Sequence, residues 1–558
     1  MRSWTVRRGV LPILLLQFAA PAAATTYRVG PGQPLATPGA VPWEALAAGD
    51  SVLIHSRPAA YTDKWVICRA GTQLAPIVVA GVPDPGTGAL PVIDGNNATT
   101  RSALNYWNEE RGVIKIGGAN SPPDLMPAWI VIENLDIRGG HTPNTFTGRN
   151  GVTAYNGNAS AIFIEKGQHV TIRDCHMHGC GNGFFCASET SDLVVESNWI
   201  EGNGNVGSIF EHNNYTEALG VTFQFNRFGP LLAGAGGNNL KDRSAGCVVR
   251  YNWIEGGNRQ LDLVESDFDA LINDPRYHQT FVYGNVLIET GDDGNSQIAH
   301  YGGDGGVTAG YRKGTLYFHH NTVVSKRTGN TTLLRLSTNG ESADVRDNVV
   351  YVTAAGNKLA LLDQTGTLVA TRNWFKTGWV ASFSGGSVTD AGQVTGADPG
   401  FVDFAGADYG LAAGSPCIGQ AVALAAACLP DHRPVLEYVK HQTWRGRVDD
   451  GAADLGAFER ASTVGVPPGA GAAPGSALLV TPNPFRGACD VRLAAGSGGA
   501  PSAAAYDALE VFDLSGRRIA SVSPSAPGAW RWSPDGSVKA GVYFLRVLGA
   551  RPQAVFVR

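Results

Sequence analysis

Short strand-like runs recur along the middle of this chain, and each run closes on an Asn or an Asp. The runs are rich in β-branched and aromatic residues and alternate apolar with polar positions, which is typical of strands. The closing residues are Asn134, Asp174, Asn198, Asn226, Asn252, Asn285, Asn321, Asn348 and Asn373. Their spacing of about 24 to 40 residues is the signature of a solenoid, in which each repeat is one coil of several short strands.

The closing Asn residues have a structural interpretation. Asn tolerates a left-handed backbone, and its amide can bind the Asn of the next coil, so we expect a ladder of Asn side chains along the axis. Coils stacked about 4.8 Å apart pair their strands in parallel and bury a continuous core. The repeats therefore predict an all-β fold, a parallel β-helix over residues 25–460, and we assign no catalytic role to these Asn residues.

The composition agrees with this fold class. Glycine accounts for 72 of the 558 residues, whereas charged residues make up only 16%. This balance favours many turns and stacked β-structure. The net charge of -5 comes without any run of Lys or Arg, so nucleic acid is not an expected partner.

The two ends of the chain differ from the repeats. Residues 1–24 combine a basic start, an apolar stretch and a small-residue cleavage site, which indicates a signal peptide. No other apolar stretch is long enough to cross a bilayer. Residues 461–476 have linker composition, and short alternating strands over residues 477–558 predict a small β-sandwich. We expect an exported monomer, secreted or held at the outer cell surface, without a transmembrane segment after cleavage.

The repeat region resembles the pectate-lyase-like family of right-handed parallel β-helices. DPGFVD at 398–403, the following AAGSPCIG, and GAADLGAFER ending at Arg460 look like the closing coils of many secreted members. That family contains polysaccharide lyases, glycoside hydrolases and some non-enzymatic surface proteins. The resemblance implies a right-handed solenoid whose partner is a polysaccharide.

The C-terminal region resembles a second family. TPNPF at 481–485, LEVFDLSGRR at 509–518 and AGVYFLRV at 540–547 occur in the order found in the immunoglobulin-like sorting domain of type IX secretion cargo and in the related hook-cap-type domain. The resemblance implies that this domain engages the secretion machinery. In that family the domain is often removed or anchored after export.

A candidate active site follows from aligning the coils on their turn residues. The alignment superposes Ile209, Leu240, Leu263, Ile298 and Leu334 as a buried row and places ionisable side chains in the next row. Ionisable groups on adjacent coils repel one another unless a cation, a proton or a base compensates, so such a row is costly as mere structure. We therefore predict catalytic residues in the middle of the helix, namely Glu211, Lys241, Asp242, Arg243, Glu265 and His300.

Three readings of this cluster remain open. In a lyase, Lys241 would remove the proton α to a uronic acid carboxylate and Arg243 would neutralise the developing enolate. The segment NNLKDRSAGCVVRYNWIEGG around these residues resembles the Lys-bearing strand of chondroitinase B-like and alginate lyases. In a hydrolase, two of the predicted carboxylates would serve as acid and base. In a non-catalytic glycan-binding protein or adhesin, the charges would form a ladder that joins the coils. We favour β-elimination.

Further residues are expected around this centre. His212 and Tyr301 lie beside the predicted row and would bind substrate, and Trp253 offers a flat face for stacking on a sugar ring. Glu265 and Asp267 could supply oxygen ligands to Ca²⁺.

The eight cysteines all follow the signal peptide. Export permits disulfides, and Cys417 with Cys428 is the expected pair. Another group of cysteines, which lies close to His176 and His178, lacks the paired spacing of a zinc site. We expect these residues to be small buried side chains in stacked turns: Cys175, Cys180 and Cys186.

Overall fold

The computed structural model describes residues 24–448 and 451–460 and, beyond them, the strands and some short segments between residues 476 and 557. The proposed signal peptide, apart from Ala24, and residues 461–475 of the predicted linker at 461–476 lie outside the described residues. The described part is almost entirely β-structure; its one α-helix is the four-residue α1 (Asp269–Ile272). None of its helices is long and apolar enough to span a bilayer.

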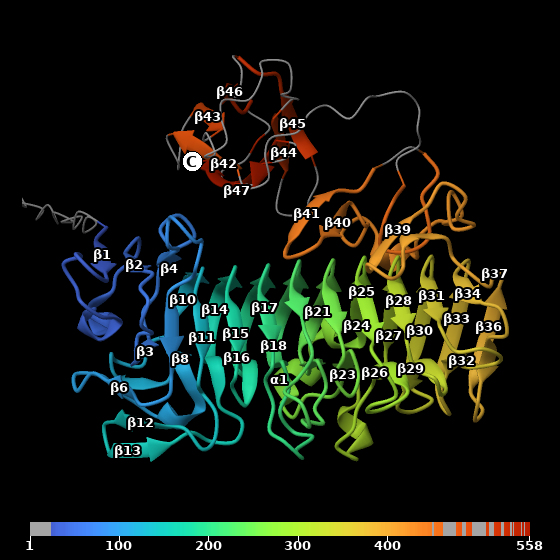
Figure 1. Cartoon of the computed structure of the whole chain (residues 1–558), viewed down its shortest axis with the longest axis horizontal. Helices are drawn as coiled ribbons and strands as arrows, with labels where there is room; N and C mark the ends of the chain where they lie inside the picture. The colour runs from blue at the N-terminus through green and yellow to red at the C-terminus, as the bar shows by residue number, and fades with distance from the viewer. Residues whose placement is uncertain are drawn as a thin grey trace, which may run out of the picture.

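The repeats form a parallel β-helix whose coils succeed one another along the long axis of the molecule (Figure 1). Each regular coil contributes one short strand to each of three faces, as the coil of β20, β21 and β22 does. Each strand then pairs in parallel with its counterpart in the next coil. In β14, β16 and β18 a single long strand bends from the third face into the first, with irregular register in β14 and β16.

The first face consists of the strands that come directly before the closing Asn and Asp residues, together with their counterparts in the other coils. It comprises β1 (Thr26–Val29), β2 (Ser51–His55), β4 (Ile77–Val82), β10 (Ala128–Glu133), the later parts of β14 (Ser160–Arg173), β16 (Asn182–Glu196) and β18 (Asn214–Gln224), then β21 (Ala245–Arg250), β24 (Gln279–Tyr283), β27 (Thr315–His319), β30 (Ser342–Arg346), β33 (Thr367–Thr371) and β36 (Ser387–Ala391).

The second face is the 11-stranded sheet. It comprises β5 (Val92–Asp94), β11 (Asp136–Arg138), β15 (His176–His178), β17 (Trp199–Glu201), β19 (Arg227–Phe228), β22 (Trp253–Glu255), β25 (Val286–Glu289), β28 (Thr322–Ser325), β31 (Val349–Val352), β34 (Trp374–Lys376) and β37 (Val394–Gly396).

The third face holds the candidate site. It comprises β3 (Asp63–Ile67), β8 (Gly112–Ile116), the early parts of β14, β16 and β18, then β20 (Leu240–Asp242), β23 (Leu261–Leu263), β26 (Gln297–Tyr301), β29 (Thr331–Leu336), β32 (Leu359–Leu362) and β35 (Val380–Ser382). The hairpins β38 (Phe401–Asp403) with β39 (Asp408–Leu411) and β40 (Leu436–Val439) with β41 (Thr443–Gly446) follow the last coil.

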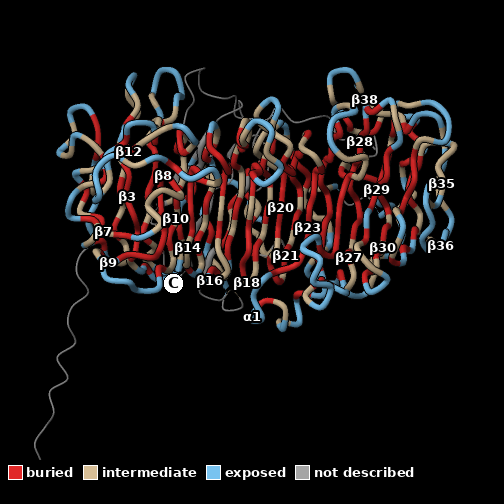
Figure 2. The backbone as a smooth tube through the Cα atoms, turned by 90° about the horizontal axis from the view of Figure 1, so that it is seen from below, coloured by how far each residue is buried: buried red, intermediate tan, exposed pale blue. Residues whose placement is uncertain are grey.

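The core runs without interruption inside the coils. Alternate residues of the strands along the body of the helix point inward, and Figure 2 shows most of these strands buried, whereas β35 and β36 near one end are largely exposed or half-buried. Val249, Val282, Phe318 and Val345 stack in register on the first face and are fully buried. A fully buried side chain of this size stabilises the fold by about 1.5–3 kcal/mol.

The Asn ladder predicted from the sequence is confirmed from Asn198 onward. Each amide oxygen accepts from the amide of the preceding coil, as Asn285 Oδ1 does from Asn252 Nδ2 at 3.0 Å, and the series continues to Asn373. The left-handed residue, however, is the one before the Asn, for example Tyr251 with φ 54°. In the two earliest turns Asn134 and Asp174 occupy this left-handed position, so they do not belong to the ladder.

The expected disulfide between Cys417 and Cys428 is wrong. Both thiols are free and buried, because they pack in different apolar clusters, Cys417 beside Trp374 and Cys428 beside Tyr251. The interpretation of the other cysteine group is confirmed: all three side chains are buried in the core, namely Cys175, Cys180 and Cys186.

The described C-terminal strands form two four-stranded sheets. One contains β42 (Ser476–Thr481), β43 (Cys489–Leu493), β46 (Ala529–Trp532) and β48 (Ala550–Arg551); the other contains β44 (Leu509–Phe512), β45 (Arg518–Val522), β47 (Gly541–Arg546) and β49 (Gln553–Val557). Trp530, Val511 and Leu545 are buried in one shared cluster. The immunoglobulin-like topology and the sorting role of this C-terminal region remain predictions.

Candidate functional site

The structure corrects the register predicted for the third face. Lys241, not Asp242, is the outward residue of β20, and it pairs with Tyr215 on one side and with Asp262 on the other. Asp262 in turn pairs with His300. Leu240 pairs with Leu261 rather than with Leu263, so the sequence alignment was displaced by two residues in β23. Ile209 lies outside the buried row and is exposed.

Lys241 lies at the centre of a charged cluster. Its ammonium donates to Asp262 Oδ2 at 2.8 Å and to Asp304 Oδ2 at 2.7 Å. Burial alone would lower the pKa of Lys241, but the two carboxylates outweigh it and hold the pKa above its ordinary value. The side chain is therefore a fixed cation, which does not fit the predicted role of a general base, since a base of this kind needs a lowered pKa.

Asp262 connects Lys241 to His300. Its Oδ1 accepts from His300 Nδ1 at 2.9 Å, and the other imidazole nitrogen lies 2.8 Å from Ser337 Oγ. Burial alone would raise the pKa of Asp262, but the His300 hydrogen bond and the charge of Lys241 hold it well below its usual range. Burial lowers the pKa of His300, so this buried chain fixes a neutral imidazole against an ionised carboxylate. His300 thus belongs to the cluster as predicted, in a supporting position.

Arg243 also belongs to the charged cluster. Its guanidinium pairs with the exposed carboxylate of Asp267, and Asp304 Oδ1 is 3.9 Å away. Glu265 is turned elsewhere, because its two oxygens accept from the backbone N–H groups of Asp304 and Gly305 at 2.8 and 2.5 Å. The predicted calcium ligands Glu265 and Asp267 therefore have other partners in this structure.

Tyr215 is the residue that sequence reasoning missed. It is half-buried at the position beside Lys241, and Arg243 lies 5.8 Å from its ring centroid. Its ring stacks on Phe185 at 5.0 Å, and Phe185 meets Phe163 edge-on at 5.5 Å. Burial raises the pKa of Tyr215 while Arg243 and Lys241 lower it, with a net rise. An aromatic row therefore leads along the face to the charged cluster, a feature visible in sequence only once the correct register is known.

Asp242 is not an active-site carboxylate. It points into the helix and is fully buried, accepting from Thr216 and Ser244 at 2.7 Å and pairing with Arg312 at 3.2 Å. Arg312 is itself fully buried and also donates to the backbone oxygen of Val264. This pair joins the core of neighbouring coils.

Glu211 and His212 precede β18 rather than lying in the predicted row. Glu211 is buried, and its Oε2 has no hydrogen-bond partner among the described residues. His212 Nδ1 accepts from the backbone of Asn238 at 2.9 Å, and its ring lies 5.6 Å from that of Tyr215. Burial and the charge of Lys241 lower the pKa of His212 to about 3. His212 therefore supports Tyr215 as a neutral ring.

Two predicted substrate contacts are wrong. Tyr301 is fully buried inside the coils, where it pairs with Leu336. Trp253 lies on the second face, where Tyr409 and Tyr438 cover it at ring distances of 5.6 and 6.2 Å. Neither side chain can reach a ligand at Lys241.

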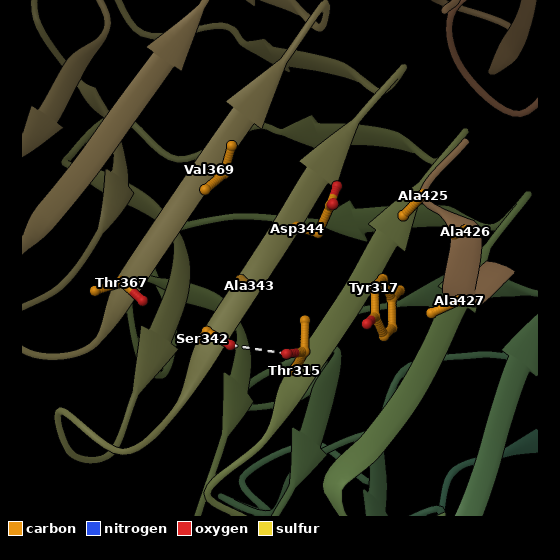
Figure 3. A pocket seen from close by; sticks show the side chains of 10 residues that line it. All are labelled: Thr315, Tyr317, Ser342, Ala343, Asp344, Thr367, Val369, Ala425, Ala426 and Ala427. Atoms are coloured by element: carbon orange, nitrogen blue, oxygen red, sulfur yellow. Dashed lines mark hydrogen bonds between the residues drawn. The ribbon is translucent and has the colours of Figure 1, made fainter. Parts of the chain in front are cut away.

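A separate hollow of about 410 Å³ lies on the first face, over β27, β30 and β33. Figure 3 shows Tyr317, Asp344 and Val369 along it, with residues 425–427 at one side. The only carboxylate among its lining residues, Asp344, pairs with Arg346. This hollow lacks the paired cations of the third face.

Fold and register define the chain as a right-handed parallel β-helix protein. A family model described as "Right handed beta helix region" matches residues 93–275. The comparison with curated proteins finds no match.

Several solved structures are similar to this chain at low identity. An alginate lyase from Paenibacillus sp. str. FPU-7 is 12% identical with a TM-score of 0.39, over 62% of this chain and 93% of that one. A GH136 lacto-N-biosidase from Eubacterium ramulus is 13% identical with a TM-score of 0.34, over 66% and 67%. The pectin methylesterase from Aspergillus niger is 11% identical with a TM-score of 0.26, over 74% and 94%.

Proposed function

We propose that this chain is an exported, carbohydrate-active β-helix enzyme that cleaves a uronic-acid polysaccharide by β-elimination. The observation that carries the proposal is the placement of Tyr215 beside two cations, Lys241 on the adjacent coil and Arg243 next to it. Tyr215 is half-buried, so part of its side chain is open to a ligand at this position.

The three side chains match the steps of an elimination. A base takes the proton on the carbon α to the carboxylate, the C–O bond to the leaving sugar breaks, a C=C bond forms, and the leaving oxygen gains a proton. Lys241 and Arg243 would neutralise the uronate and the negative charge that develops on it. Tyr215, as the phenolate that the charges of Arg243 and Lys241 favour, would take the proton from the α carbon and then return it to the leaving sugar oxygen. This assignment replaces Lys241 with Tyr215 as the acid–base group.

The aromatic row supplies a surface for the rest of the polymer. Phe185 is half-buried and continues the stack from Tyr215. Aromatic faces of this kind pack against the apolar faces of sugar rings. Binding along Phe185 would bring one uronate of the chain over Tyr215.

Export and calcium are part of the proposal. The N-terminal segment supports a secreted or surface-held protein, and the C-terminal motifs support recognition by the secretion machinery. A Ca²⁺ requirement is kept as one arm of the test, because Asp262, Asp304 and Asp267 already pair with Lys241 and Arg243.

The test is the ultraviolet absorbance of unsaturated products, recorded while the purified chain is incubated with several uronic-acid polysaccharides, with and without Ca²⁺. Tyr215→Phe should lower the rate by about 10²–10⁴-fold, and Lys241→Gln should also lower it. The matched control is Tyr317→Phe: Tyr317 stacks on Phe281 at 5.1 Å on the first face and is also half-buried. The activity of the Tyr317→Phe variant should equal that of the wild type.

Three outcomes would contradict the proposal. Unsaturated product formed equally by Tyr215→Phe and Tyr317→Phe would remove Tyr215 from the mechanism. New reducing ends without absorbance would indicate a hydrolase, for which Asp262 and Asp304 around Lys241 are the nearest carboxylates. Binding of the polysaccharides without either product would indicate a glycan-binding surface protein.

A further inference from the structure

Three neighbouring coils bring two histidines and two carboxylates together on the second face. β11, β15 and β17 lie side by side (Figure 1). Asp136 is in register with His176, and His178 is in register with Glu201. These side chains point outward and are half-buried, while Ile137, Met177 and Ile200 of the same strands fill the core.

The side-chain atoms converge on the Asp136 carboxylate. His178 Nε2 lies 3.0 Å from Oδ1, and His176 Nδ1 lies 3.3 Å from Oδ2. One ligand atom from each of Asp136, His176 and His178 can be chosen so that all lie within 4.8 Å of one another, and no other group of three His, Cys, Asp or Glu among the described residues does so. Separations of this size suit ligands placed about 2.0–2.2 Å from a common ion.

His176 adds a second observation. Its Nε2 is buried without a hydrogen-bond partner, and Glu201 Oε1 is 3.7 Å away. The ring is held between His178 and Trp199, with centroids at 4.1 and 4.2 Å. In metal sites a coordinating histidine typically donates its other N–H to a carboxylate. Glu201 lies where that acceptor is needed.

We propose that Asp136, His176 and His178 form a binding site for a divalent transition-metal ion of the zinc type, with Glu201 as the positioning residue for His176. Two imidazoles and one carboxylate are a ligand set that zinc accepts, and three protein ligands leave a position for water. The ion would replace the protons now shared between the histidines and Asp136. It would also join two successive coils directly and a third through Glu201, on a face separate from the Lys241 cluster.

The ionisation of the carboxylate agrees with this site. Burial alone would raise the pKa of Asp136, but the hydrogen bonds from His176 and His178 hold it well below its usual range. Asp136 is therefore a carboxylate across the neutral range.

The experiment measures zinc binding to the purified chain, prepared without a histidine tag and stripped with a chelator. Equilibrium dialysis with Zn²⁺ should give one tightly bound ion per chain. His176→Asn and His178→Asn should each lower the affinity more than 100-fold, and Glu201→Gln by about 10–100-fold. The matched control is His169→Asn, because His169 also stacks on a tryptophan and pairs with a carboxylate, Asp192 at 3.4 Å, but has no second imidazole.

The proposal is overturned if the wild type binds no zinc, or if His169→Asn loses as much affinity as His178→Asn. Thermal unfolding without zinc checks that the variants are folded. A second readout needs no variant: Co²⁺ bound by the wild type should show d–d absorption from nitrogen and oxygen ligands. An intense thiolate-to-metal band would instead assign the ion to cysteines and would also overturn the proposal.

Discussion

Lys241 and Asp262 form a buried ion pair between neighbouring coils, with Nζ 2.8 Å from Oδ2 and side chains only 9% and 1% exposed. The two residues occupy paired positions of β20 and β23, so the backbone register itself places the charges together. Asp262 also accepts from His300 and from Asn238. Without Lys241, the buried negative charge of Asp262 would lose a positive charge that offsets it.

We therefore expect Lys241→Met to destabilise the fold. Breaking one side of a buried ion pair costs about 3 kcal/mol, and the remaining hydrogen bonds to Asp262 keep the loss near this lower limit. Denaturant unfolding at neutral pH measures the change. Lys326→Met, at an exposed lysine, should change stability by about 0.5 kcal/mol or less. Equal effects of the two substitutions would show that the pair does not stabilise the helix.

Asp347 should make stability depend on pH. Burial raises its pKa to about 7, and its Oδ2 is buried without a hydrogen bond to any described residue. The unfolded chain loses this proton near pH 4, about three units earlier. Stability from this group is therefore fully present at low pH and declines as the pH rises from about 4 to about 7.

Asp347→Asn should remove that decline. The backbone at this position is left-handed, with φ 57°, which Asn tolerates. We expect a gain on the order of 2 kcal/mol at about pH 8 and a smaller gain at about pH 5. Thermal unfolding at the two pH values measures the difference, and a gain independent of pH would contradict the assigned pKa.

Asn285 should be among the most sensitive positions of the ladder. Its Nδ2 donates to Val249 and Asn321, and its Oδ1 accepts from both nitrogens of Asn252. Asn285→Leu would strand these buried groups, each at a cost of about 1–3 kcal/mol. We expect a total loss of at least about 3 kcal/mol in denaturant unfolding. Asn330→Leu, at an exposed loop position, should have little effect, and a comparable loss there would argue against the ladder.

All eight cysteines should be thiols. Alkylation of the denatured but unreduced protein, followed by mass spectrometry, should label each of them. Burial raises the pKa of both Cys417 and Cys428 to about 12, so we expect the native protein to react slowly. A protected Cys417–Cys428 pair in the denatured sample would restore the disulfide expected from the sequence.

The sequence indicated the region of the charged site but not which side chains contact one another there. Lys241, Arg243 and His300 were identified because ionisable residues recur there against an apolar background. Their partners were not, because a shift of two residues along a strand keeps the same inward and outward pattern. Periodicity therefore could not distinguish Leu261 from Leu263 as the partner of Leu240.

The sequence by itself determined the coil. Strand-like alternation and the recurring Asn residues require stacked parallel strands, because a single coil cannot bury its own apolar side chains. The tertiary structure alone decided which outward residues meet. The connections between successive strands of a face set the register. Those between β18 and β20 placed Tyr215 beside Lys241, and those between β11 and β15 placed Asp136 beside His176. Such contacts depend on the path of each loop in space, which the local pattern of residues does not encode.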